Sequence, residues 1–254
     1  MSDIDMRNSD AIDLLRSMKD KVAQTFVTSP PYGIGKEYER KTTTSSWVEW
    51  IEPIVREAKR VTAEHMFWQV GNHVKNGVVT PLDIILYPIV ACDGWVLRNR
   101  IAWTYGHGLH ASRRFSGRHE TVLWFTRGDN YHFDLDAVRV PQKWPQKKYY
   151  KGPRKGELSG NPLGKNPGDV WDIPNVKHNH PEKTEHPCQF PEHLAQRIIR
   201  CSTRFGDVVL DPFMGSGTTA IVAAREGRRF IGGDISKKYI AISNHRLAEL
   251  KGEK

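Results

Sequence analysis

Val208-Val209-Leu210-Asp211-Pro212-Phe213-Met214-Gly215-Ser216-Gly217-Thr218-Thr219 is the segment of this chain that decides the fold. Its first three residues form a short apolar run, which is typical of a central parallel strand, and the glycines favour a tight turn before a helix. A helix over residues 218–226 and a strand over residues 229–233 follow at the spacing of a βαβ unit. This unit predicts a parallel sheet with helices on its faces.

The rest of the chain alternates between helical and extended patterns, apart from one long irregular stretch. Between residues 131 and 185 the periodicity disappears, and we expect a basic, loop-rich region that becomes ordered on binding. A single domain over residues 1–254 accounts for the length. Further helices are expected over residues 10–21, 45–60, 81–91, 191–203 and 237–250, and strands over residues 25–27, 65–70, 98–105, 120–126 and 207–210.

The composition favours a polyanionic partner. The chain has 254 residues and a formal net charge of +9, and Lys and Arg gain affinity for nucleic acid by displacing condensed counterions. The three cysteines are odd in number, which argues against a disulfide framework and predicts a cytoplasmic protein. Neither a signal-peptide pattern nor a membrane-spanning apolar run is present, so we expect neither export nor membrane insertion. The spacing of His178, His180, His186 and Cys188 matches no structural zinc site, and no metal is expected.

The turn at Gly215 and Gly217 predicts a site for a nucleoside without a phosphate group. Asp211 ends the apolar run, at the edge of an open sheet where ligands bind. A phosphate-binding loop would carry a lysine before the hydroxyl residue, whereas this turn continues directly with Thr218. Asp234, at the end of the next expected strand, lies where an acidic side chain accepts hydrogen bonds from ribose hydroxyls. In the alternative interpretation the glycines only make a sharp connection and Asp234 only caps a helix.

A second segment, Thr28-Ser29-Pro30-Pro31-Tyr32, is suited to a planar substrate that carries an amine. The two prolines remove backbone donors and leave free carbonyl acceptors, and Ser29 adds a hydroxyl. Tyr32 offers an amphipathic ring for stacking. A rigid surface turn is the alternative when such a tetrapeptide stands alone.

Together the two segments resemble the catalytic and cofactor motifs of the amino-group DNA methyltransferases, which transfer a methyl group from S-adenosylmethionine to cytosine N4 or adenine N6. The catalytic motif comes first, the basic irregular region follows and the cofactor motif comes last. This order resembles the circularly permuted beta group of the family. The resemblance covers most of the chain and implies a Rossmann-like α/β fold with a mixed, mostly parallel sheet flanked by helices.

The resemblance also implies a cofactor site. Asn8-Ser9-Asp10 resembles the Gly-Asp segment of the family, with serine in place of glycine. His186-Pro187-Cys188-Gln189-Phe190-Pro191 resembles a His-Pro-Thr-Gln-Lys-Pro segment, with phenylalanine in place of lysine. The residues implied to bind S-adenosylmethionine are Asp10, Thr28, His186, Pro187, Gln189, Asp211, Pro212, Phe213, Gly215, Ser216, Gly217, Thr218 and Asp234.

Catalysis is implied for Ser29, Pro30, Pro31 and Tyr32, with the Ser29 hydroxyl and the Pro30 carbonyl accepting hydrogen bonds from the target amine. A base inside a duplex must be flipped out to reach such a pocket, and stacking on Tyr32 would offset part of that cost. His119-Glu120 resembles the segment that helps shape the target-base pocket.

Serine at position 29 favours cytosine N4, since adenine N6 enzymes that resemble this group more often carry aspartate there. Adenine N6 is the first alternative, and methylation of RNA or of a protein amide is another. A catalytically idle DNA-binding module on the same scaffold is the alternative from a different class. The implied partners are double-stranded DNA and a cognate restriction endonuclease that acts separately, and the expected assembly is a monomer or a homodimer.

Two basic groups are expected to contact DNA, mostly through phosphates. One lies in the loop after the expected strand 98–105, and the other lies in the irregular region, where aromatic residues are interleaved with the cations. A solvated charged face is the alternative. The residues are Arg113, Arg114 and Arg118 in the first group, and Arg139, Lys143, Lys147, Lys148, Lys151, Arg154 and Lys155 in the second.

Overall fold

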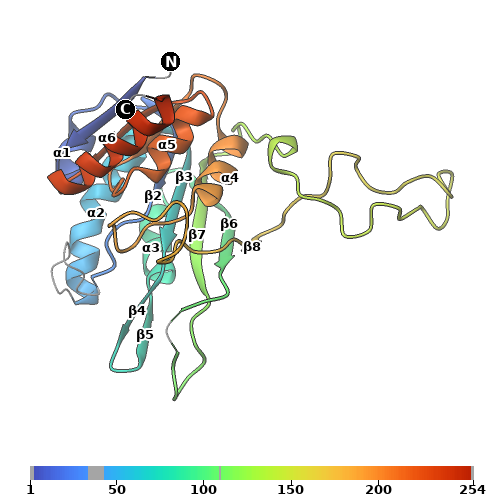
Figure 1. The fold of residues 1–254 in the computed structure, drawn as a ribbon, viewed down its shortest axis with the longest axis horizontal. Coiled ribbons are helices and arrows are strands. Elements are labelled where there is room, and N and C mark those ends of the chain that lie inside the picture. The colour runs from blue at the N-terminus through green and yellow to red at the C-terminus, as the bar shows by residue number, and fades with distance from the viewer. Residues whose placement is uncertain (1–2, 34–42, 109, 253–254) are drawn as a thin grey trace.

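The computed structural model describes residues 3–33, 43–108 and 110–252, and one large sheet organises them (Figure 1). Its order is β1–β10–β9–β2–β3–β7–β6–β8, and every neighbouring pair is parallel except those of β7, which runs antiparallel to β3 and β6. The predicted mixed, mostly parallel sheet is confirmed. The strands are β1 (Ile4–Asn8), β2 (Ala23–Thr28), β3 (Thr62–Val70), β6 (Trp95–Thr104), β7 (His119–Arg127), β8 (Val170–Asp172), β9 (Val208–Asp211) and β10 (Arg229–Asp234).

Helices cover both faces of the sheet because successive strand residues point to opposite sides. Phe26 of β2 belongs to one core and its neighbour Val27 to the other. The first core packs against α1 (Ala11–Arg16), α2 (Thr44–Val61) and α3 (Leu82–Val90), and the second against α4 (Glu192–Ser202), α5 (Thr218–Arg225) and α6 (Lys237–Lys251). Among the described residues, no helix combines the length and the apolar character needed to cross a membrane.

Strands β1, β4 (Asn72–Lys75) and β5 (Val78–Pro81) and the end of α1 differ from the sequence-based expectations. Strand β1 was missed because it is a half-polar edge strand, which pairs with β10. The hairpin of β4 and β5 was also missed, although its Asn76-Gly77 turn, with positive φ at both residues, is a strong hairpin signal. The helix expected over residues 10–21 was too long: α1 ends at Arg16, and Lys21 has a φ of 52°, which is incompatible with a continuing helix.

The irregular region of residues 131–185 contains a long projecting segment. The backbone bridges Val140–Lys165 and Lys148–Leu158 close it into an arm that leaves the body of the molecule (Figure 1). We call residues 140–165 the basic arm. The absence of regular structure was expected over the whole region, but Val170–Asp172 forms β8 and pairs with β6. Three residues are too few to show periodicity in a sequence.

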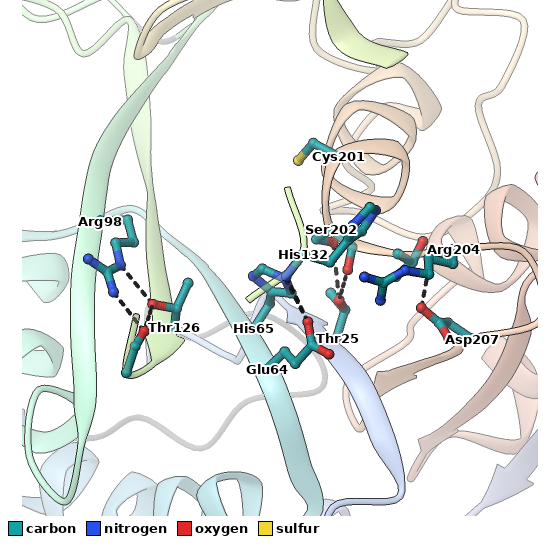
Figure 2. A network of polar contacts seen from close by, with 12 residues as sticks. Thr25, Glu64, His65, Arg98, Thr126, His132, Cys201, Ser202, Arg204 and Asp207 are labelled. Carbon is teal, nitrogen blue, oxygen red and sulfur yellow. Dashed lines mark hydrogen bonds and ion pairs between the residues drawn. The ribbon is translucent and has the colours of Figure 1, made fainter. Parts of the chain in front are cut away.

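Polar contacts fasten the connections at the amino ends of the parallel strands (Figure 2). The Thr25 hydroxyl of β2 donates to the Ser202 carbonyl at the end of α4 over 3.0 Å, and the Glu64 carboxylate of β3 accepts the His132 backbone N–H over 3.0 Å. Burial lowers the pKa of His65 to about 4, so its imidazole is neutral at pH 7. The polar side chains at this amino edge bond to other parts of the chain. The opposite, carboxyl edge is where we look for a ligand site.

Candidate active site

Four neighbouring parallel strands bring site residues to the carboxyl edge of the sheet. Strand β2 ends at Thr28, β9 at Asp211 and β10 at Asp234, while Asp10 follows the end of β1. These strands are adjacent in the order β1–β10–β9–β2, so the first residues of the chain meet the last third of it. The segment of Ser29 and the glycine turn therefore leave the sheet side by side.

Asp211 organises the turn from within. Its carboxylate is fully buried and accepts hydrogen bonds from the hydroxyls of Thr28 and Thr219, both over 2.7 Å, and from the backbone N–H of Phe213 over 3.1 Å. Burial raises the pKa of this carboxyl to about 6, although the three hydrogen bonds oppose the shift. The hydrogen bond with Thr28 joins β9 to β2. Because the Asp211 side chain has no exposed surface, only the backbone of this residue could contact a ligand.

The two glycines of the turn are required by the packing of other segments. Gly215 has a φ of 50° and Gly217 a φ of 77°, a region that favours glycine. A Cβ on Gly215 would lie 2.9 Å from His186 Nε2, and a Cβ on Gly217 would lie 2.7 Å from Ser243 Oγ of α6. Gly217 thus allows α5 to begin close against Ser243 of α6, which is the purely structural role of a sharp connection between strand and helix. Gly215 lets the segment of His186 approach the turn.

Asp234 keeps acceptor capacity for a ligand. One carboxylate oxygen accepts the backbone N–H of Gly215 over 3.1 Å, and the other accepts the backbone N–H of Ser236 over 2.8 Å. Each oxygen has a second lone pair, and the side chain is half-buried. Burial raises the pKa of this carboxyl. Asp10, which follows β1, is exposed. It caps α1 by accepting the backbone N–H of Ile12 over 2.9 Å.

The segment after the irregular region lies over the turn. The His186 ring packs edge-on against the Tyr239 ring of α6, with 4.5 Å between the ring centres. Gln189 is buried and shapes this segment: its amide donates to the Glu182 carbonyl over 2.7 Å, and its side-chain oxygen accepts the Thr184 hydroxyl over 2.9 Å. Gln189 therefore positions the segment, and Pro187 is exposed beside it.

Ser216 and Thr218 face the protein interior. Both are buried, and Arg246 of α6 donates to the Ser216 carbonyl over 2.7 Å and to the Thr218 hydroxyl over 3.2 Å. Phe213, in contrast, is only half-buried, and its ring lies 5.6 Å from that of Trp50 of α2. The side chain of Phe213 is therefore more accessible to a ligand than those of Ser216 and Thr218.

Hydrogen bonds tie the predicted catalytic segment together. The Trp47 indole of α2 donates to the Pro31 carbonyl over 2.8 Å, which fixes the segment against the helix. The Tyr32 hydroxyl donates to Glu120 Oε2 over 3.1 Å and accepts from Gln69 Nε2 over 2.9 Å. It lies 3.3 Å from Ser29 Oγ. With the Tyr32 proton on the carboxylate, we assign Ser29 as the donor in the remaining contact.

The direction of these bonds determines what Ser29 can offer. With its own proton on Tyr32, the serine oxygen keeps its lone pairs for an outside donor such as an amine. Burial, with the Glu120 charge as a second cause, raises the pKa of Tyr32 well above 10, so the phenol stays neutral. The segment thus presents a hydroxyl acceptor of fixed orientation.

Three residues of this network were absent from the predicted catalytic set. They are Gln69 near the end of β3, Tyr105 just after β6, and Glu120 at the start of β7, for which only a role in pocket shape was expected. Burial raises the pKa of Glu120 and that of Tyr105, the latter to about 12. A polar residue near the end of a mostly apolar expected strand is the sequence signal that could have identified Gln69, which is buried in the structure.

An open hollow of about 540 Å³ adjoins the Tyr105 side of this network. It lies between the ends of β6 and β8 and the start of β7, and its floor is formed by strand ends of the same carboxyl edge. Its lining residues are Thr104, Tyr105, Gly106, Arg118, His119 and Asp172.

The predicted DNA-contacting residues differ in their surroundings. Arg113 and Arg114 are exposed in the loop between β6 and β7, and the lysines of the basic arm are exposed. Arg139 is 15 % exposed and donates to Asp136 over 2.5 Å and to the Gly164 carbonyl over 3.1 Å, so it holds the base of the arm. Arg154 pairs with Glu157 over 2.8 Å and remains largely exposed. Within residues 3–33, 43–108 and 110–252, no group of three or more His, Cys, Asp or Glu is placed to hold a metal ion.

Sequence relatives of the chain are DNA methyltransferases. The model of the N6/N4 DNA methylase family matches residues 23–245. Type II methyltransferase M.BglII of Bacillus subtilis is 48% identical over 244 residues, which cover 95% of this chain and 68% of the relative. DNA adenine methyltransferase YhdJ of Escherichia coli (strain K12) is 31% identical over 245 residues, which cover 94% of this chain and 81% of the relative.

Solved structures share the fold. The PvuII DNA methyltransferase, described as cytosine-N4-specific, superposes with a TM-score of 0.76 at 21% identity and covers 100% of this chain and 92% of its own. The DNA modification methylase TTHA0409 of Thermus thermophilus, complexed with S-adenosyl-L-methionine, has a TM-score of 0.68 at 23% identity and covers 98% of this chain and 94% of its own. At such identities these likenesses concern the fold.

Proposed function

The chain belongs to the N6/N4 DNA methylase family, and from this membership we propose that it methylates the N4 amine of cytosine within a specific site of duplex DNA. As a member it is an S-adenosylmethionine-dependent methyltransferase that acts on double-stranded DNA. The choice of cytosine rests on one observation, the neutral hydroxyl of Ser29 held with its lone pairs free.

The residues at the carboxyl edge fit S-adenosylmethionine. Asp234 retains acceptor capacity for ribose hydroxyls, and the turn offers a hydroxyl residue without the lysine that a phosphate would need. The residues that would hold the cofactor are those of the turn, Asp10, Asp234 and the segment of His186. When bound, S-adenosylmethionine supplies an electrophilic sulfonium methyl group.

The catalytic segment prepares the amine for attack. An exocyclic amine is a poor nucleophile because its lone pair is delocalised into the ring. Ser29 Oγ and the Pro30 carbonyl accept hydrogen bonds from its two N–H groups and favour a tetrahedral nitrogen. Tyr32 holds the Ser29 hydroxyl, and Trp47 holds the carbonyl of Pro31, the residue after Pro30, so part of the rate comes from positioning.

Adenine N6 is the second candidate, and a relative named as an adenine methyltransferase supports it. Nucleoside mass spectrometry of DNA from cells that express the protein distinguishes the two. We expect N4-methylcytosine in that DNA and none in DNA from cells that express Ser29→Ala. N6-methyladenine would overturn the choice of base, and the absence of both would leave an idle DNA-binding module.

The proposal extends to the biological setting. Relatives named as type II methyltransferases support a role beside a cognate restriction endonuclease that acts as a separate protein. The exposed lysines of the basic arm, together with Arg113, Arg114 and Arg118, would contact the DNA backbone. We include a cytoplasmic location and a monomeric or homodimeric assembly in the proposal.

A further inference from the structure

Phe115 is the most exposed aromatic residue in the described part of the chain, with 100% of its surface open to solvent. It lies in the connection between β6 and β7, and we call residues 105–118 the Phe115 loop. A single exposed aromatic side chain is ordinary on a protein surface. The loop that carries it and the site beside it give this one a specific setting.

The Phe115 loop is fastened at its base and near its tip. The backbone N–H of Tyr105 donates to the Arg118 carbonyl over 3.0 Å at the base, and the backbone N–H of Ala111 donates to Ser116 Oγ over 3.1 Å near the tip. Arg114 donates to the Phe115 carbonyl over 3.0 Å. Figure 1 shows this connection projecting from the sheet. These three hydrogen bonds stabilise the backbone that carries the phenyl ring of Phe115.

The loop rises from the rim of the catalytic network. Tyr105, its first residue, interacts with Glu120, which accepts the hydroxyl of Tyr32. Tyr105 and Arg118 also line the open hollow at this edge. The Phe115 loop therefore leaves and rejoins the sheet at this edge, with Tyr105 in contact with Glu120 of the catalytic network and Arg118 in the lining of the hollow.

The positive charge of the Phe115 loop favours a polyanionic partner. Arg113, Arg114 and Arg118 lie within residues 105–118, and this stretch contains no Asp or Glu. Cations attract the phosphate backbone, while an apolar ring among them matches the wedges that proteins insert between stacked bases. Duplex DNA satisfies both features at once.

We infer that Phe115 is a wedge that enters the base stack when the target base leaves it. This inference rests on the proposed function, because the target must be flipped out of a duplex. The arginines hold the backbone on either side, and the phenyl ring stacks on the bases that the target has left. The ring thereby stabilises the flipped state and makes no contact with the methyl donor.

The test compares two duplexes that contain the site methylated in expressing cells. In one the target base is fully paired, and in the other it lies opposite an abasic position, so that flipping costs little. Methyl incorporation is measured in single turnovers with radiolabelled S-adenosylmethionine. For Phe115→Ala we expect a loss of about 10- to 100-fold on the paired duplex, the scale of one stacking contact, and a much smaller loss on the other.

Matched variants separate a wedge from a general loss of surface. Phe205→Ala removes another exposed phenyl ring, 84% open to solvent at the opposite edge of the sheet, and should leave both rates unchanged. Phe115→Trp keeps an aromatic wedge and should retain most activity. A fluorescent base analogue at the target position should brighten on binding to the wild type and brighten less with Phe115→Ala.

Equal losses on the two duplexes, or no loss on either, would overturn the wedge while leaving the methyltransferase proposal intact. Failure of the wild type to methylate any duplex would instead overturn the proposed function. Calorimetric titration of Phe115→Ala with S-adenosylmethionine verifies that the variant is folded.

Discussion

Replacing Tyr32 by phenylalanine tests whether the hydroxyl, and not only the ring, matters for catalysis. The ring that was expected to stack on the base is retained, and the oxygen that joins Ser29, Gln69 and Glu120 is removed. Gln69 keeps its direct hydrogen bond to Glu120, whereas Ser29 loses the acceptor of its proton. The variant therefore releases Ser29 and leaves the base platform in place.

The structure sets the size of the effect. A hydrogen bond to a charged group contributes about 1.5–3 kcal/mol, so the loss of the Tyr32–Glu120 bond should lower the free energy of unfolding by about that amount. A displaced positioning group of this kind reduces a rate by about 100-fold. We expect Tyr32→Phe to lose about 10- to 100-fold in kcat with little change in DNA affinity.

The assay measures single-turnover methylation and equilibrium DNA binding on the same duplex. Tyr105→Phe is the comparison, because it removes a hydroxyl that interacts with Glu120 and leaves the contact between Tyr32 and Ser29 in place. It should lose much less activity. A wild-type kcat for Tyr32→Phe would refute the role of the hydroxyl and return Tyr32 to stacking alone. A large loss of DNA affinity would refute the separation of the two roles.

Four further predictions concern individual contacts. Ser29→Ala should abolish most methyl transfer, while S-adenosylmethionine binding, measured by calorimetry, survives. Asp234→Ala should weaken S-adenosylmethionine binding about 10-fold or more through the lost ribose hydrogen bonds, and unchanged binding would argue against this role. Gly217→Ala should lower the free energy of unfolding in urea by about 1–3 kcal/mol, because its Cβ would lie 2.7 Å from Ser243 Oγ at a φ of 77°. The pKa of His65 is about 4 in the folded protein and 6.5 in its ordinary state, so on acidification the imidazole is protonated in the unfolded chain before it is protonated in the folded one. The free energy of unfolding should therefore fall by up to about 3 kcal/mol between pH 7 and pH 4. His65→Gln should show a shallower fall over the same range.

The two motifs were predictable because each depends on local chemistry. Consecutive prolines after Thr28 end a strand, and glycines at 215 and 217 allow the positive φ that the turn adopts. The alternation of residues such as Phe26 and Val27 between two cores follows from the strand geometry itself. The parallel sheet and a ligand site at its edge, after Asp211, were therefore expected from the sequence.

Partners that lie far apart in the chain were not predictable in the same way. The resemblance implies only a role in the shape of the target-base pocket for Glu120, and Gln69 falls within an expected strand, yet both bond to the hydroxyl of Tyr32. Arg139 counted as one more cation, whereas it braces the base of the basic arm against Asp136. In each case the side chain type was visible, but the neighbour that fixes its role was not.

The sequence by itself determined the backbone conformations of the turn and of the proline segment, the class of the sheet and the chemistry of the two ligands. Only the tertiary structure decided that β3 and β7 lie beside β2, which brings Gln69 and Glu120 to Tyr32 and makes Ser29 the donor to it. The physical reason is range. A turn or a strand depends on steric limits within a few residues, whereas the direction of a hydrogen bond depends on which distant donor and acceptor the packed fold leaves within about 3 Å of each other.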